Sequence, residues 1–125
     1  MTVFIRYSGA TMLPQRHRLP KQYIPLPRLH TRVYHADHIT LAVFQDTSQK
    51  ATRCAVIVSK KGLTAPERNM LRRRGYEAIG IVYTRLSPGY LCMFSLKKGV
   101  NRDFSYQVMI EEIETLCTKA GIISS

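Results

Sequence analysis

The chain has 125 residues and carries 19 Lys and Arg against 8 Asp and Glu, which gives a formal net charge of +11. Such an excess favours a polyanionic partner, either nucleic acid or an anionic membrane surface. A hydrophobic content of 45% argues against wholesale disorder, and the length fits one folded domain. No apolar run approaches the roughly 20 residues that span a bilayer. Residues 1–12 lack the order of a secretory signal, so we expect a soluble, cytoplasmic protein.

The first half of the chain predicts an irregular start followed by two strands. Residues 1–16 show no sustained hydrophobic period, and prolines at 20, 25 and 27 allow only a short or broken helix over residues 19–29. Between residues 31 and 44, apolar positions alternate with polar ones, which is typical of strands. Residues 45–52 are polar and predict a loop. Residues 53–59 then form a continuous apolar run, which predicts a strand near the centre of the sheet.

A basic helix is predicted to follow this strand. Thr64 and Glu67 have the capping-box spacing, and Pro66 suits a first helical turn. Gly75 weakens the helix by about 1 kcal/mol relative to Ala, so we expect a close packing contact or a bend there. The pattern fades between residues 79 and 84.

Projection at 100° per residue divides this helix into a polar side and an adjoining apolar stripe. The polar side consists of Arg68, Asn69, Arg72, Arg73 and Tyr76. The stripe consists of Leu71, Gly75, Ala78 and Val82. One side can therefore pack while the other faces phosphate, although a solvated basic face on an ordinary α/β domain would show the same pattern.

The last third of the chain predicts a strand and a core-packing helix. Residues 87–89 form a turn into an apolar strand over residues 90–96, and helical spacing resumes from residue 104 to residue 120. One arc of this helix is apolar: Met109, Ile110, Ile113, Leu116, Cys117 and Ala120. Four of the eight acids cluster on or beside it: Asp103, Glu111, Glu112 and Glu114. The positive field therefore belongs to the rest of the molecule.

Neither the cysteines nor the histidines form a metal-binding pattern. The three cysteines are far apart and lie in apolar segments, so we expect buried, reduced thiols: Cys54, Cys92 and Cys117. The histidines have one acid nearby, Asp37, and no adjacent cysteine, and we expect surface or RNA-facing side chains: His17, His30, His35 and His38. No paired carboxylates or activated nucleophile stand out, so we expect no catalytic residue and no metal ligand.

Several motifs in order resemble the protein subunit of bacterial ribonuclease P. Val58-Ser59-Lys60-Lys61 is followed after an interval of six residues by Arg68-Asn69 and then Arg72-Arg73. The resemblance extends upstream to the stretch from Met12 to Leu19, and downstream through residues 86–90 to the closing Lys119-Ala120-Gly121-Ile122-Ile123. It therefore covers residues 12–123. Residues 1–11 precede the usual start of the family, so we expect either an extension there, disordered or irregular, or translation that starts at Met12. A single domain is expected over residues 12–125.

The resemblance implies an α/β (α+β) two-layer sandwich like a ribosomal protein domain. About four strands in a mixed sheet and two to three helices are expected, with a left-handed strand-helix-strand crossover through the basic helix. The implied function is to assist a catalytic RNA subunit in removing the 5′ leader from precursor tRNA, as a monomer on one RNA, with Mg²⁺ bound mainly by the RNA. The implied RNA contacts are Arg16, Arg18, Lys60, Lys61, Arg68, Asn69, Arg72, Arg73 and Arg74.

The chain also departs from the family pattern. Met70 stands where the usual Arg-Asn-Arg signature has its second arginine, and the proline-rich residues 19–29 replace a helix that carries aromatic residues lining a leader cleft. Tyr23, Tyr34 and Ser59 are the nearest candidates for that cleft. Arg74 projects away from the side of Arg68 and Arg72. Two rival functions remain open: a ribosomal-type module that binds another RNA, and a stand-alone small enzyme.

Overall fold

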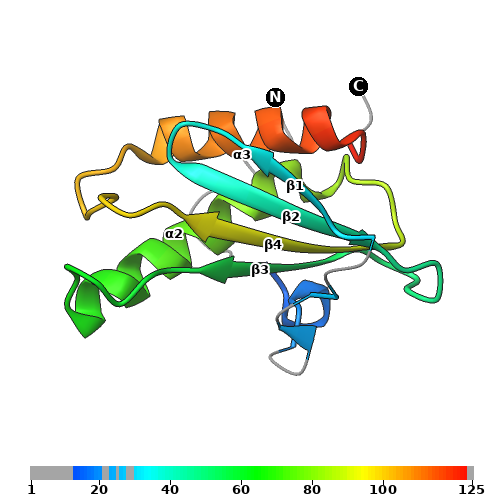
Figure 1. Ribbon diagram of the computed structural model, residues 1–125, viewed down its shortest axis with the longest axis horizontal. Coiled ribbons are helices and arrows are strands. Elements are labelled where there is room, and N and C mark those ends of the chain that lie inside the picture. The colour runs from blue at the N-terminus through cyan, green and yellow to red at the C-terminus, as the bar shows by residue number, and fades with distance from the viewer. Residues whose placement is uncertain (1–12, 21–22, 25, 28–29, 124–125) are drawn as a thin grey trace.

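A computed structural model describes residues 13–20, 23–24, 26–27 and 30–123. The predicted extension over residues 1–11 lies outside this part of the chain. After a short 3-10 turn η1 (Gln15–His17), the elements run in the order β1 (Arg32–His35), β2 (Ile39–Gln45), β3 (Arg53–Ile57), α2 (Ala65–Tyr83), β4 (Tyr90–Leu96) and α3 (Tyr106–Ala120). Each predicted strand and helix is present, so the two-layer α+β arrangement is confirmed (Figure 1).

The four strands form one mixed sheet in the order β1-β2-β4-β3. β1 with β2 and β2 with β4 are antiparallel, whereas β3 and β4 are parallel. The prediction that β3 lies near the sheet centre is wrong, because β3 occupies an edge. Its continuous apolar run has another cause: Cys54 and Val56 face the main core, while Ala55 is buried on the opposite face.

Both long helices cover the same face of the sheet (Figure 1). Helix α2 connects the parallel strands β3 and β4. In this view α2 lies behind the sheet, β4 lies above β3, and both arrows point left. This is the left-handed sense of crossover, opposite to the common one. The arrangement places the start of α2 at the end of β3, next to the loop of residues 58–64.

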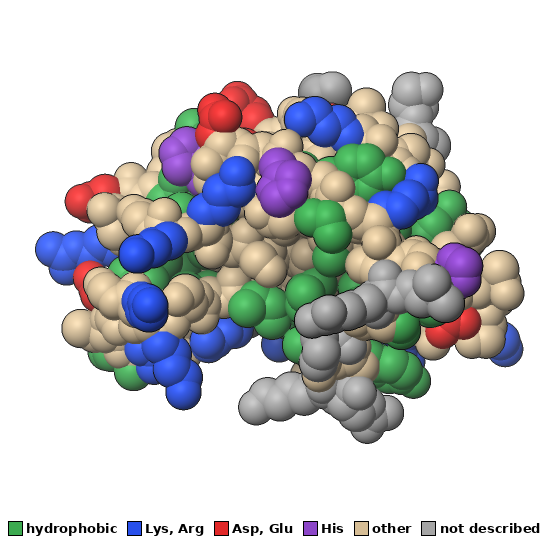
Figure 2. All heavy atoms as spheres, in the orientation of Figure 1, with side chains coloured by type: hydrophobic (Ala, Val, Ile, Leu, Met, Phe, Trp, Pro, Cys, Tyr) green, Lys and Arg blue, Asp and Glu red, His purple; other side chains and the backbone are tan. Residues whose placement is uncertain are grey.

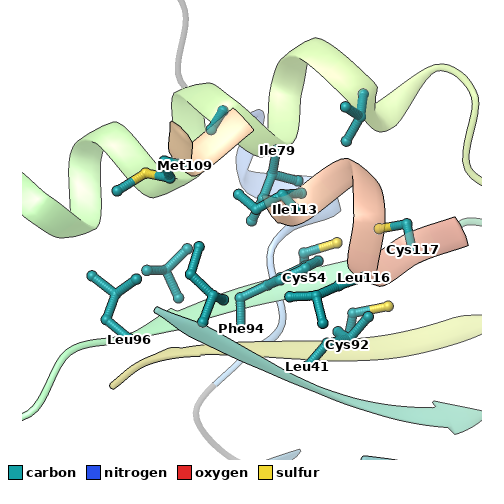
Figure 3. Close-up of a cluster of buried hydrophobic side chains, with 14 of the residues drawn as sticks. Leu41, Cys54, Ile79, Cys92, Phe94, Leu96, Met109, Ile113, Leu116 and Cys117 are labelled. Atoms are coloured by element: carbon teal, nitrogen blue, oxygen red, sulfur yellow. The ribbon is translucent and has the colours of Figure 1, made fainter. Parts of the chain in front are cut away.

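The core between the sheet and the helices is closely filled (Figure 3). Phe94, Leu41 and Leu96 from the sheet meet Ile79 of α2 and Ile113 of α3. Burial of side chains of this size contributes about 1.5–3 kcal/mol each. The core therefore holds both helices, and with them the outer face of α2, in fixed positions.

Helix α2 begins where the capping box predicts. The Thr64 hydroxyl accepts from the Glu67 backbone N–H (3.3 Å), and the Glu67 carboxylate accepts from the Thr64 N–H (2.9 Å). The second of these bonds is the main reason why the pKa of Glu67 is lowered. Together they satisfy two backbone donors that an uncapped helix would leave free. The first turn that carries Arg68 is thus well defined.

Gly75 makes the close packing contact predicted from the sequence. A Cβ atom at this position would lie 2.8 Å from Val56 Cγ1 and 3.0 Å from Val56 Cγ2. Real Cβ atoms do not approach carbon this closely, so glycine lets the helix lie directly against β3.

Described residues of the segment that precedes β1 partly cover the second face of the sheet. Leu19 and Leu26 are buried there against Ala42, Ala55 and Leu91. The segment is tied to the edge of β3 by a bond from the Leu19 backbone N–H to the Cys54 carbonyl (2.8 Å). Within its described residues the only helical turns are short, as the prolines predict.

Candidate nucleic-acid interface

The loop that leaves β3 forms an exposed basic turn. Ser59, Lys60 and Lys61 are all exposed, and the Ser59 hydroxyl accepts from the Lys61 backbone N–H (3.2 Å). Gly62 follows with a φ of 77°, a left-handed conformation that favours glycine. Ser59 thus shapes the turn that presents the two lysines.

The first half of α2 carries four arginines in different environments. Arg68 is half-buried, and its guanidinium donates to the Leu63 carbonyl (3.0 Å), so it braces the basic turn as well as carrying charge. Arg72 donates to the Asn69 side-chain oxygen (2.9 Å), which joins two predicted contacts. Arg73 is exposed. These side chains form a continuous cationic surface with Lys60 and Lys61.

Arg74 points elsewhere, as its projection predicts. Its guanidinium donates to the Arg102 carbonyl (3.2 Å) in the loop between β4 and α3. In the same region, a cavity of about 310 Å³ is lined jointly by Lys61-Gly62-Leu63 and by Lys98-Gly99-Val100-Asn101. Lys98 and Arg102 therefore extend the cationic surface. Neither residue could be predicted from sequence spacing, because both are distant from α2 in sequence and close to it only in the folded chain.

Figure 2 shows the result as a group of Lys and Arg side chains at the left end of the molecule, over the start of α2. The acids of α3 lie on another side and are largely engaged. Glu112 accepts from His38 (2.6 Å), and Glu114 pairs with Arg85 (2.5 Å). The predicted separation of an acidic helix from a basic binding side is present in the structure.

A groove runs from this surface along the open edge of β3. A cavity of about 410 Å³ is lined by Leu19, Ile24, residues 55–58 of the edge strand, and Arg72 and Tyr76 of α2. Tyr76 was predicted to share the phosphate-facing side of α2. It is half-buried instead, with its ring under the Arg18 guanidinium at 4.5 Å and its hydroxyl accepting from the Val56 N–H at 3.4 Å.

Arg18 has a structural role in this groove. Besides stacking on Tyr76, its Nε donates to the Leu13 carbonyl (2.9 Å). A second cavity of about 430 Å³ continues beside it, lined by Gln15, Arg16, Arg18, Leu19, Pro20, Arg53 and Tyr76. Arg16 is exposed there, whereas Arg18 is half-buried. Arg18 thus fixes the groove wall, and Arg16 presents its charge to solvent.

The structure does not bring the two candidate cleft tyrosines together. Tyr23 packs beside Leu19 and Leu26 on the open face of the sheet. Tyr34 belongs to the helix-covered side, where it packs against the main core. Alternation along β1 explains this, because Tyr34 pairs with Leu41, whose side chain faces the helices. Only Tyr23 lies on the face that adjoins the groove.

The cysteines are buried and free, as predicted: Cys54, Cys92 and Cys117. A hydrogen bond to Cys54, together with burial, raises the pKa of Cys92, and burial raises that of Cys117, so both thiols stay protonated. Among the described residues, no group of three or more His, Cys, Asp or Glu could hold a metal ion. Within the same ranges, no helix is long and apolar enough to cross a membrane.

The sequence profile of the family described as Ribonuclease P matches residues 15–121. The chain belongs to the ribonuclease P protein family. It is 32% identical over 112 residues to the ribonuclease P protein component of Synechococcus elongatus, covering 89% of this chain and 90% of that protein. The corresponding protein of Roseiflexus castenholzii is 27% identical over 108 residues, with 86% of this chain and 87% of that protein covered.

Solved structures of ribonuclease P proteins share the fold. The Staphylococcus aureus protein matches with a TM-score of 0.71 and 15% identity, covering 86% of this chain and 98% of that one. The Thermotoga maritima protein matches with a TM-score of 0.71 and 16% identity, covering 82% and 96%. The ribonuclease P assignment implies a general role in tRNA processing together with an RNA subunit. Met70, where the resemblance leads us to expect an arginine, is half-buried in the structure.

Proposed function

We propose that this chain is the RNA-binding subunit of ribonuclease P, which assists the catalytic RNA in removing the 5′ leader from precursor tRNA. In this proposal one protein monomer binds one ribonuclease P RNA in the cytoplasm. The observation that carries it is the cationic surface of α2 and the basic turn, which opens directly into the groove beside β3. The ribonuclease P RNA would bind the cationic surface, and the leader would lie in the neighbouring groove.

The cationic surface suits phosphate contacts that position an RNA without reading its sequence. Lys60, Lys61 and Arg73 are exposed and can neutralise phosphates, while Arg72 and Asn69 act as a hydrogen-bonded pair. If about five cations touch phosphate, the slope of log affinity against log salt should be about −4.5 for duplex-like contact and about −3.5 for single strands. A slope near zero would contradict this account.

The groove suits an extended single strand. Its floor is the outer edge of β3, where Leu19 bonds to the Cys54 carbonyl. The apolar residues of this edge can contact bases, and Arg72 and Arg18 line the sides of the groove. Tyr76 is held by Arg18, so its ring is a fixed wall. Tyr23 adds an aromatic side chain nearby on the open face. Stacking on such rings contributes about 1–3 kcal/mol per base and tolerates many sequences.

The chemistry of hydrolysis is assigned to the RNA. The described residues offer no carboxylate cluster that fits Mg²⁺, so we place the Mg²⁺ of the reaction on the RNA subunit and assign no step to the protein's own side chains. What the protein supplies is charge neutralisation and a fixed path for the leader.

The test is cleavage of precursor tRNA at low Mg²⁺, with the protein alone, with ribonuclease P RNA alone, and with both. We expect cleavage only when both are present. Cleavage by the protein alone would identify a stand-alone enzyme. RNA binding without any stimulation of cleavage would identify a ribosomal-type module that stabilises a different RNA.

A further inference from the structure

A fourth cavity lies at the opposite end of α2 from the cationic surface. It has a volume of about 420 Å³ and is lined by η1 and its flanks, by the β2–β3 loop and by the end of α2. Its position is about 17 Å along the helix axis from Arg72, given a rise of about 1.5 Å per residue. Nothing in the proposed leader path requires it.

The aromatic wall of this cavity is a stacked pair. The rings of His17 and Tyr83 lie 4.2 Å apart at an interplanar angle of 18°. The Tyr83 hydroxyl donates to the Thr52 carbonyl (2.5 Å), and the buried Thr52 hydroxyl in turn donates to the Ser87 carbonyl (2.5 Å). These bonds hold the tyrosine ring in place, so the wall is formed before any ligand arrives.

The cavity also carries positive charge. Arg16 and Lys50 are exposed at its rim, and no Asp or Glu is among the described residues that line it. His17 contributes a neutral ring: its Nδ1 is buried without a hydrogen-bond partner, and burial lowers its pKa. This arrangement suits a nucleotide, because the two cations can bind its phosphate and the aromatic pair can contact its base.

The cavity adjoins the groove at Arg16. Arg16 lines both this cavity and the neighbouring one that contains Arg18 and Tyr76. A single strand that leaves the edge of β3 would therefore meet Arg18, then Arg16, and then the His17–Tyr83 pair. We propose that this cavity binds one nucleotide of a single-stranded segment of the bound RNA, with its base against His17 and Tyr83 and its phosphate on Arg16 and Lys50.

This inference rests on the proposed function, because it extends the same RNA-binding path. The test uses the full chain and a fluorescein-labelled single-stranded RNA hexamer, with binding measured by anisotropy at low salt and amide shifts measured by NMR. Ala51→Leu fills the cavity without changing charge, and Lys50→Gln removes one rim charge. Lys119→Gln is the control, because it removes the same charge from α3, where Lys119 donates to the His35 carbonyl (3.2 Å).

We expect Ala51→Leu to weaken hexamer binding about five- to a hundredfold, the range for loss of one stacked base. Lys50→Gln should reduce the salt slope by about 0.7, and the hexamer should shift amides of residues 50–52 and 83–86 in the wild type. Unchanged affinity in a folded Ala51→Leu variant would overturn the inference. A second result would also overturn the inference: adenosine monophosphate shifts these amides, and the hexamer does not displace it. The cavity would then bind a free nucleotide and not a segment of RNA.

The two proposals fail differently. A protein that binds the hexamer through this cavity but does not stimulate ribonuclease P RNA would refute the proposed function and leave the cavity assignment standing. A protein that stimulates cleavage while Ala51→Leu binds and stimulates normally would refute the cavity alone.

Discussion

The two halves of α2 have opposite compositions and opposite surroundings. From Ala65 to Arg74 the helix carries four arginines and buries only Leu71. From Gly75 to Tyr83 it carries no Lys or Arg and buries most of its length against the sheet and α3. One continuous helix thus joins the half for which we propose RNA binding to a packing half, and the packing half holds the other in position.

This difference separates two kinds of mutational effect. Substitutions of the buried aliphatic residues in the second half should change the free energy of unfolding, and substitutions of the arginines in the first half should change RNA affinity. A substitution that changed both would show that the halves are coupled through the helix.

The largest expected effect is on stability, from Ile79→Ala in the packing half. Ile79 is fully buried in the core, so its truncation should lower the free energy of unfolding by about 2–5 kcal/mol. Urea denaturation measures this, and Ile81→Ala, at a half-buried position on the same helix, is the control with a smaller loss. The RNA affinity of the folded fraction should stay unchanged. A large loss of affinity would contradict the separation of stability from binding along the helix.

The second effect is on binding, from Arg68→Ala with Arg72→Ala. Removal of two cations should weaken ribonuclease P RNA binding about ten- to a hundredfold and reduce the salt slope by about 1.8 for duplex-like contact. Because Arg68 also donates to the Leu63 carbonyl, the unfolding midpoint should be measured alongside. Lys119→Ala is the matched charge control. Unchanged RNA affinity in the folded double variant would refute the assigned role of these arginines.

A smaller effect is expected at Gly75, on the boundary between the halves. Alanine gains about 1 kcal/mol of helix propensity but places its Cβ into Val56, and such overpacking costs about 1–3 kcal/mol. We expect Gly75→Ala to be destabilising by about 1 kcal/mol. In a Val56→Ala background the clash disappears, and the same substitution should become neutral or stabilising. Equal effects in both backgrounds would show that Val56 is not the obstacle.

The smallest effect concerns pH. Burial, aided by the charges of Arg16 and Arg53, lowers the pKa of His17 below 6.5 in the folded state. The unfolded chain then binds more protons in the acidic range, so the stabilisation is present above about pH 6.5 and is lost as pH falls through the folded pKa. Urea midpoints between pH 7.5 and 5.5 should fall more steeply for the wild type than for His17→Phe. Parallel curves would show that His17 does not titrate differently on folding.

Local patterns in the sequence predicted much of the fold. The start of α2 follows from Thr64 and Glu67, and the contact at Gly75 follows from a glycine on the apolar stripe. Strand order was not predictable in this way. A continuous apolar run is expected both for a central strand and for an edge strand whose faces are covered, so the run in β3 does not distinguish them. The edge position appears only when the segment around Leu19 is placed.

The candidate interface was predictable where its residues are close in sequence. The basic turn and the arginines of α2 lie within one short stretch, so spacing alone groups them. Lys98 and Arg102 come from another loop and are brought near by the topology. The placement of Tyr34 on the helix-covered side depends on strand register, which is set by pairing with Leu41 rather than by β1 itself.

The bond between Leu19 and Cys54 has a consequence for the order of assembly. During synthesis the segment of residues 13–20 leaves the ribosome well before its partners Cys54 and Tyr76. Its hydrophobic side chains must therefore wait until β3 and α2 have formed. The groove is completed only at that stage, because Arg72 and Tyr76 of α2 form part of its lining.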